Sequence, residues 1–192
     1  MKRLDTIKKA LYRYFVPFLM LYASSLNASG YDDDVLEIFS KMLPRFVLMS
    51  NQKNLLKERL EICILNDKID EKTALILMSK IDTNYPNGIK NYKIRLVEGD
   101  YANVNVCRNS QLIFMFDSTD ENIAKAIRYS KENHVLSMSY DAKYLENGVG
   151  ASLFLGRKVV PYININALHK NGVEFDNLLV QISKIYASEE VR

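Results

Sequence analysis

The 192-residue sequence contains no tryptophan, only two cysteines and two histidines, and no catalytic signature. His134 and His169 each lack a second metal-binding residue at ligand spacing, so we predict structural roles for both and no metal site. A Gly-x-Ser-x-Gly elbow is also missing, and no base stands beside a nucleophile. These absences predict a protein that is not an enzyme.

Glycine is scarce as well, with seven in the chain. The segment after the first predicted strand, residues 66–70, has no glycine and carries two carboxylates, which disfavours a phosphate-bearing cofactor there. The single Gly-x-Gly, Gly148 to Gly150, precedes a predicted strand instead of a helix. We therefore expect no cofactor, and we expect the two glycines to serve a tight turn or a close approach of the backbone.

The N-terminus predicts the compartment. Small residues follow an apolar run from Tyr14 to about Ala23, and the basic residues before the run are Lys2, Arg3, Lys8, Lys9 and Arg13. This is the pattern of a secretory signal peptide, and the run is too short for a spanning helix, which needs roughly 20 residues. We expect residues 1–28 to be a signal peptide that is removed on export to the periplasm, with cleavage near Ala23 or Ala28.

Removal of this segment changes the charge of the protein. The whole chain has 26 basic and 23 acidic residues, and residues 1–28 hold five of the basic and one of the acidic residues. The remaining chain has 21 basic and 22 acidic residues, a net charge of −1, so net charge predicts no binding to nucleic acid. Residues 29–192 show no repeat or linker, and we predict a single domain.

Apolar strands alternate with amphipathic helices through the middle of the chain. This order predicts an α/β fold with a doubly wound, mostly parallel sheet covered by helices, followed by an antiparallel C-terminal hairpin and a closing helix. Ser118, Thr119 and Asp120 are expected to cap one of the helices. The expected strands are 60–66, 90–97, 111–117 and 134–140, and the expected helices between them are 70–81 and 121–133.

An amphipathic helix is also expected before the first strand, from about residue 35. Pro44 is expected to kink or interrupt this helix. The acidic trio Asp32, Asp33 and Asp34 suits capping and compensation of the helix dipole. A cation site is disfavoured because three consecutive carboxylates point in different directions.

The predicted hairpin joins residues 151–154 and 159–165 through a turn at 155–158. Pro161 has no N–H for a ladder, so it marks an edge position or a bulge. Asn164 leaves the hairpin, and we expect its amide to satisfy backbone groups at the crossing to the last helix. Direct contact of Asn164 with a partner is the alternative.

Two cysteines in an exported chain favour a disulfide, because the periplasm is oxidising and an even count leaves no thiol unpaired. Cys63 lies in the first predicted strand and Cys107 lies just before the third. Those strands are neighbours in the flavodoxin-like order, so a bridge is geometrically reasonable. The alternative is two buried, unpaired thiols.

The C-terminal block, residues 134–187, carries the most distinctive combination of residues. They are Val135, Leu136 and Ser137, then Gly148, Val149 and Gly150, then Ile163, Asn164 and Ile165, and finally Leu178 and Leu179. With these residues the block resembles the YfiR-like family of periplasmic regulators, in which a strand precedes a Gly-rich turn, a hairpin ends on an Ile-Asn-Leu element and a helix follows. The chain departs from the family at Pro161 and Tyr162, where members often have Phe-Glu, so no role of that glutamate is carried over.

The resemblance implies a regulator that inhibits an inner-membrane diguanylate cyclase through its periplasmic sensor domain, in response to envelope or redox stress. It also implies a homodimer, and it agrees with a disulfide between Cys63 and Cys107, although a second disulfide of some members is absent. The alternative is a periplasmic ligand-sensing module for a histidine kinase or another membrane receptor.

Two further hypotheses come from the residues alone. Asp67, Asp117, Ser139 and Lys158 have a spacing suggestive of a phosphoacceptor receiver domain, but no phosphoryl donor is expected outside the cytoplasm and Lys158 falls in a predicted turn. Exposed tyrosines at strand ends or loops suit anchors of an interface. These are Tyr85, Tyr92, Tyr101, Tyr140, Tyr144 and Tyr162.

Overall fold

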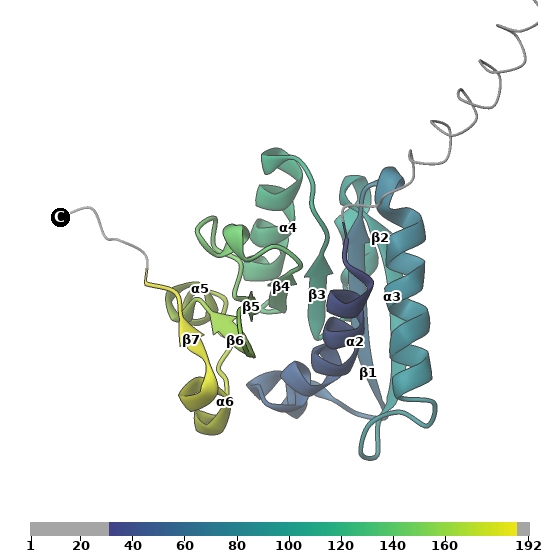
Figure 1. Cartoon of the computed structure of the whole chain (residues 1–192), viewed down its shortest axis with the longest axis horizontal. Coiled ribbons are helices and arrows are strands. Elements are labelled where there is room, and N and C mark those ends of the chain that lie inside the picture. Colours follow the sequence, from purple (N-terminus) through teal and green to yellow (C-terminus); the bar gives the residue numbers. More distant parts are fainter. Residues whose placement is uncertain (1–30, 188–192) are drawn as a thin grey trace, which may run out of the picture. The chain divides into compact units, whose positions relative to one another are not determined.

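A computed structural model describes residues 31–187, so the expected signal peptide lies outside the described residues. The compact unit that begins at Asp33 is built on a seven-stranded sheet with the order β2-β1-β3-β4-β5-β6-β7 (Figure 1). The strands are β1 (Arg59–Asn66), β2 (Lys93–Asp100), β3 (Leu112–Met115), β4 (Leu136–Ser139), β5 (Ala151–Leu155), β6 (Val159–Ile163) and β7 (Lys184–Ile185). The α/β fold with a mostly parallel sheet is confirmed, since only the β5–β6 pair is antiparallel.

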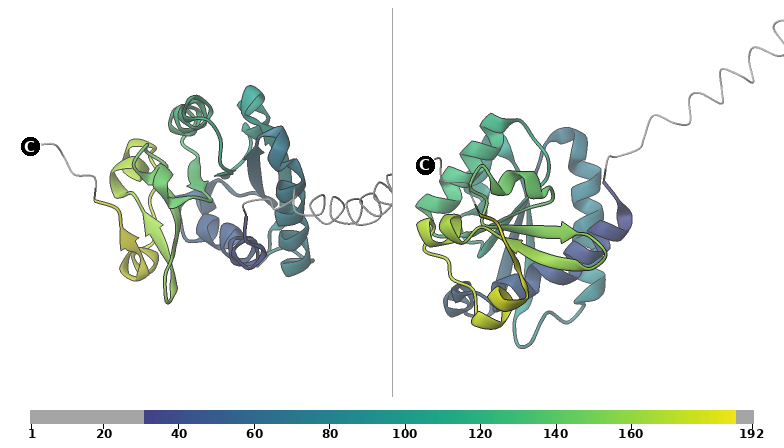
Figure 2. Two further views of the ribbon diagram at one scale, coloured as in Figure 1. Left: turned by 45° about the horizontal axis from the view of Figure 1, so that its top comes forward. Right: turned by 60° about the vertical axis from the view of Figure 1, so that its left-hand side comes forward.

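Helices cover both faces of the sheet around β1, the second strand from one edge. Seven of the eight residues of β1 are buried, as expected for a parallel strand with helices on both sides. On one face α2 (Asp33–Leu48) and α3 (Glu71–Asn84) contact each other and β1. On the other face α4 (Asp120–Glu132) packs against the 3-10 helix η3 (Tyr101–Cys107), and the left view of Figure 2 shows α2 and α4 on opposite sides of the strands.

Aromatic rings fill the space between α2 and the sheet. The ring centroid of Phe39 lies 5.0 Å from that of Phe114 in β3, and 5.5 Å from that of Tyr140. Phe39 and Phe114 are fully buried, and further buried residues from Leu36 to Leu48 anchor α2 along its length. Pro44 does not interrupt this helix, which continues to Leu48, so that half of the prediction is wrong. The packing of α2 outweighs the backbone hydrogen bond that proline removes, and a kink at Pro44 stays a prediction.

Several element boundaries differ by a few residues from the predicted ones. β2 begins three residues later than expected, because a turn closed by two backbone hydrogen bonds between Ile89 and Tyr92 occupies its predicted start. Gly88, directly before that turn, and Lys90, within it, have φ values of 82° and 52°. Helix α3 runs to Asn84, and short 3-10 helices lie before it and before β1, namely η2 (Lys68–Asp70) and η1 (Asn51–Leu55).

The C-terminal region contains the predicted hairpin and one additional strand. β5 and β6 pair from Ala151 with Ile163 to Leu155 with Val159. The closing segment contains two short helices, α5 (Ile165–Lys170) and α6 (Asn177–Ile182), followed by β7, which pairs with Tyr162 and Ile163 of β6. β7 does not pair with Pro161, so β6 is an edge of the sheet at that residue. Proline suits such a position because it has no backbone N–H to donate to a neighbouring strand. Among residues 31–187 no helix is long and apolar enough to cross a membrane.

Candidate functional site

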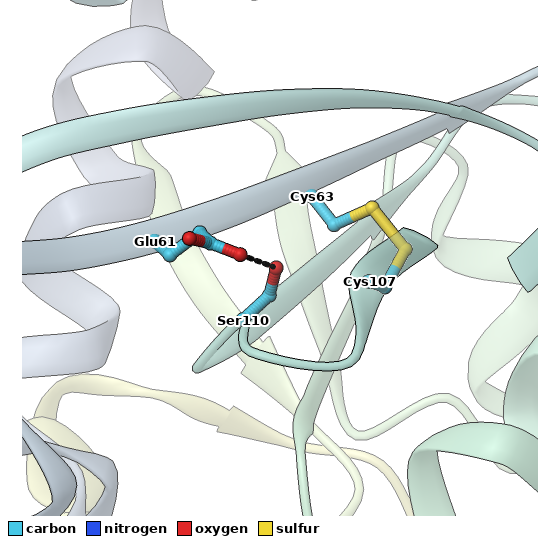
Figure 3. Close-up of a disulfide and its surroundings, with 4 residues drawn as sticks. All are labelled: Glu61, Cys63, Cys107 and Ser110. Atoms are coloured by element: carbon cyan, nitrogen blue, oxygen red, sulfur yellow. Dashed lines mark hydrogen bonds between the residues drawn. A yellow bond between two sulfur atoms is a disulfide. The ribbon is translucent and has the colours of Figure 1, made fainter. Parts of the chain in front are cut away.

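Cys63 and Cys107 form a disulfide, with an S–S distance of 2.06 Å and a Cα–Cα separation of 5.4 Å (Figure 3). Cys63 lies in β1. Cys107 is the last residue of η3, which contacts β1 on the face of the sheet that α4 also covers. Both side chains are fully buried in an apolar cluster with Ile113 and Met115 of β3. The bridge therefore fastens η3 to β1, and the chain has no free cysteine.

A carboxylate lies two residues before Cys63 on the same face of β1. Glu61 is 4% exposed, and its carboxylate accepts a hydrogen bond from the Ser110 hydroxyl at 3.4 Å (Figure 3). The guanidinium of Arg95 lies 3.5 Å from the other carboxylate oxygen. Sequence analysis missed this site, although its signal is visible: one charged residue inside the otherwise apolar strand LEICIL.

Two adjoining concavities open beside Glu61, near the first residues of β1 and β2. Their volumes are about 480 Å³ and about 330 Å³, and both are lined by Glu61, Arg95 and Asn109. We call the two together the β1–β2 groove. The other lining residues are Leu55, Lys57, Glu58, Arg59 and Gln111 in the larger concavity, and Val97, Asn103, Asn105, Val106 and Arg108 in the smaller one.

The two glycines of the Gly-x-Gly segment serve different purposes. Gly148 has a φ of +105°, a conformation that residues with a Cβ rarely adopt. A Cβ at Gly150 would lie 2.7 Å from Cδ2 of Leu168 and 3.2 Å from the carbonyl oxygen of Ser137. Gly148 therefore forms the turn, and Gly150 allows Leu168 and the backbone of Ser137 to approach closely.

Asn164 caps helix α5 and ties it to the Gly-rich turn. Its side-chain oxygen accepts the N–H of Ala167 at 2.9 Å, and its side-chain nitrogen donates to the carbonyl oxygen of Leu145 at 2.8 Å. Asn164 is 6% exposed, so these bonds are shielded from water. The structure agrees with the interpretation in which the amide satisfies backbone groups, and burial leaves little of the side chain for a partner.

Charged and polar side chains gather where β3 ends. Asp117 forms an ion pair with Lys143 at 2.8 Å and accepts a hydrogen bond from the Tyr144 hydroxyl. Burial raises the pKa of Asp117. Hydrogen bonds from Lys143 and Tyr144, the charge of Lys143 and a backbone hydrogen bond at Ser118 lower it, and the net pKa is lowered. Burial and the bond to Asp117 both raise the pKa of Tyr144.

The receiver hypothesis is disfavoured by where its four residues lie. Asp67 accepts a hydrogen bond from the Ser118 hydroxyl at 2.6 Å, so the ends of β1 and β3 do meet. Ser139, however, donates its hydroxyl to the backbone of Asp141, and Lys158 lies in the turn between β5 and β6. The lysine that pairs with Asp117 is instead Lys143.

His134 and Asp33 have partners within the fold. His134 has a φ of 56°, and its Nδ1 lies 3.1 Å from the carbonyl oxygen of Asn171. His169 lies in the last turn of α5. Asp33 begins α2 and pairs with Lys80 of α3 at 3.1 Å. Within the described part of the chain no three His, Cys, Asp or Glu residues are grouped so that they could hold a metal ion.

The prediction of exposed tyrosine anchors is wrong for two of the six residues. Tyr101 is fully buried and donates its hydroxyl to the backbone of Phe116 at 2.6 Å, and Tyr144 is 2% exposed. A tyrosine near a strand end is buried when its hydroxyl finds a backbone or carboxylate acceptor inside the fold. The half-buried ones are Tyr85, Tyr92, Tyr140 and Tyr162.

Two solved structures have a similar fold. A conserved domain protein from Vibrio cholerae O1 biovar El Tor strain N16961 has a TM-score of 0.58 and 13% identity over 78% of this chain and 59% of its own. The ABC domain of Streptococcus pneumoniae, solved in complex with L-Trp, has a TM-score of 0.55 and 6% identity over 77% of this chain and 62% of its own. The chain thus spans less than two thirds of either protein, and the likeness concerns the fold alone.

Comparison with curated protein sequences finds no significant match. The model of the YfiR/HmsC-like family, in contrast, matches residues 39–184, from within α2 to the first residue of β7. This match includes the disulfide, the Gly-rich turn and the hairpin. The chain therefore belongs to the YfiR/HmsC-like family.

Proposed function

We propose that the protein is an exported regulator that binds the periplasmic sensor domain of an inner-membrane diguanylate cyclase and inhibits it. Membership of the YfiR/HmsC-like family over residues 39–184 carries this proposal. The signal-peptide pattern of residues 1–28 supports export, and a buried disulfide suits the oxidising periplasm. The regulator acts by binding and carries out no chemistry of its own.

Stress-dependent inhibition requires two states of the regulator that differ in affinity for the cyclase. The disulfide offers one way to change between them, because it fastens η3 to β1. Two electrons and two protons from a cellular thiol reductant convert the bridge into two thiols, and the reductant becomes the disulfide. Release of η3 then shifts the regulator toward the state with lower affinity.

We assign the cyclase contact to the tip of the β5–β6 hairpin. Leu155 and Val159 form the last pair of this hairpin, and they are 48% and 41% exposed. Large apolar side chains exposed together mark interaction surfaces. More of them follow along the chain in α6 and β7, at Leu178, Ile182 and Ile185.

The test is deletion of the gene followed by measurement of intracellular cyclic-di-GMP. We expect the level to rise, and we expect the wild-type chain to restore it. A Leu155→Glu variant is expected to fail in restoration, whereas Leu75→Glu, at a leucine of α3 that is 49% exposed, is expected to succeed. An unchanged cyclic-di-GMP level under every envelope stress would contradict the cyclase proposal.

Two further properties are tested separately. Cell fractionation tests the periplasmic location, and gel filtration with light scattering tests the proposed homodimer.

A second candidate is a ligand-sensing module for a histidine kinase or another membrane receptor. The observation that favours it is the polar β1–β2 groove, together with the fold likeness to a domain solved with L-Trp. A deletion that alters kinase-dependent transcription while cyclic-di-GMP stays constant would support this candidate over the first.

A further inference from the structure

The β1–β2 groove carries more positive than negative side chains. Its cations are Lys57, Arg59, Arg95 and Arg108, and its carboxylates are Glu58 and Glu61. Together its two concavities have the size of pockets that hold small molecules, which range from about 300 to 1,000 Å³. A concave surface with this excess of cations raises the local concentration of anions.

Most of this positive charge is not used within the protein. Among residues 31–187, Arg59 and Arg108 form no ion pair with a carboxylate, and Arg95 pairs with Glu61 alone. The Arg95 side chain is 55% exposed, whereas Glu61 is buried beneath it. A guanidinium has five N–H donors in a planar fork, so one contact to Glu61 leaves others for a ligand in the groove that Arg95 lines. Glu61 thus acts as a positioning residue for Arg95.

The disulfide and two hydrogen bonds tie the far wall of the groove to β1. Arg108 and Asn109 follow Cys107 directly, and Ser110 then binds Glu61, as Figure 3 shows. The side chain of Gln111 accepts the backbone N–H of Glu61 at 2.8 Å, which fixes the end of this wall to β1. Side-chain amides on the same wall add hydrogen-bonding groups, at Asn103, Asn105 and Asn109.

We propose that the β1–β2 groove binds a small solute that carries a carboxylate or phosphate group. Arg95 and Arg108 bind the anionic group through paired N–H donors, the geometry that both oxyanions match. The amides of the wall bind hydroxyl or carbonyl groups of the same solute. This inference does not depend on a diguanylate cyclase partner, since it concerns a site at the opposite edge of the sheet from the β5–β6 hairpin.

The test is isothermal titration calorimetry of the purified protein with citrate and, separately, with inorganic phosphate. We expect saturable binding of at least one probe at one site per chain. Binding of citrate alone identifies a carboxylate site, and binding of phosphate alone identifies a phosphate site. Absence of heat from both probes at millimolar concentration would overturn the proposal.

Variants locate the binding in the groove. Arg108→Gln breaks no ion pair, and we expect it to weaken binding by about tenfold or more, since hydrogen bonds to charged groups are strong. Arg157→Gln makes the same charge change in the β5–β6 turn and is expected to leave affinity unchanged. Equal affinity of Arg108→Gln and wild type, or an equal loss in Arg157→Gln, would refute the assignment. Far-ultraviolet circular dichroism checks that each variant is folded.

Discussion

The backbone N–H of Asn164 donates to the carbonyl oxygen of Gly150 at 2.9 Å, which joins the start of α5 to the Gly-rich turn. The side chain of Asn164 adds its bonds to Leu145 and Ala167. One buried residue thus holds together the turn, the end of the hairpin and a helix start. In this block, Asn164 and Gly150, two of the residues that carry the family resemblance, therefore have a structural role: they join the turn, the hairpin and α5.

Replacement of Asn164 by alanine should destabilise this junction by about 1–3 kcal/mol, because the helix loses its cap and the Leu145 carbonyl loses a buried partner. Asn164→Ser keeps a capping oxygen and should recover part of the loss. Urea unfolding measures both free energies. Equal stability of Asn164→Ala and wild type would contradict the proposed role.

A methyl group at Gly150 should also be costly. It would meet the Leu168 side chain and the Ser137 carbonyl oxygen, and we expect a loss of about 1–3 kcal/mol in the free energy of unfolding. In a double-mutant cycle, Leu168→Ala should cost less in the presence of Gly150→Ala than alone, because it relieves the closest contact. Strict additivity of the two changes would show that the predicted clash is absent.

Loss of the disulfide should lower stability by about 2–4 kcal/mol, because the bridge restricts a long loop in the unfolded chain. The Cys63→Ala, Cys107→Ala double variant and the wild-type protein reduced with dithiothreitol should show similar losses in urea unfolding. If the urea midpoints of the double variant and of the reduced wild type both equal that of the oxidised wild type, the bridge does not stabilise the fold.

Stability should depend on acid pH through Asp117. Its pKa in the folded protein lies below the ordinary 3.8, so the ionised carboxylate stabilises the fold above that value, and the contribution disappears as the pH falls through the lowered pKa. We expect Asp117→Asn to show a smaller loss of unfolding free energy than wild type between about pH 7 and about pH 3. Asp82→Asn, at an exposed carboxylate of α3, should keep the wild-type slope. A slope for Asp117→Asn equal to that of wild type would exclude the effect.

Much of the fold was predictable because local patterns agree with it. The apolar runs around Cys63 and Phe114 are buried on both faces, and such strands occur where helices cover a sheet. The cap at Thr119 was predictable for the same local reason, since its side chain accepts the N–H of Asn122. Strand β7 was missed because a two-residue strand has no periodicity of its own and exists only through pairing with β6.

Local periodicity and residue type suffice to predict the alternation of strands and helices, the two cysteines of one bridge and the glycines of the turn. Which side chains meet depends instead on the tertiary structure. Glu61 and Arg95 become partners because β1 and β2 pair in register across a crossover, and Arg108 joins the same groove because the disulfide fastens η3 to β1. Such contacts depend on strand register and packing between distant segments, which no local pattern encodes.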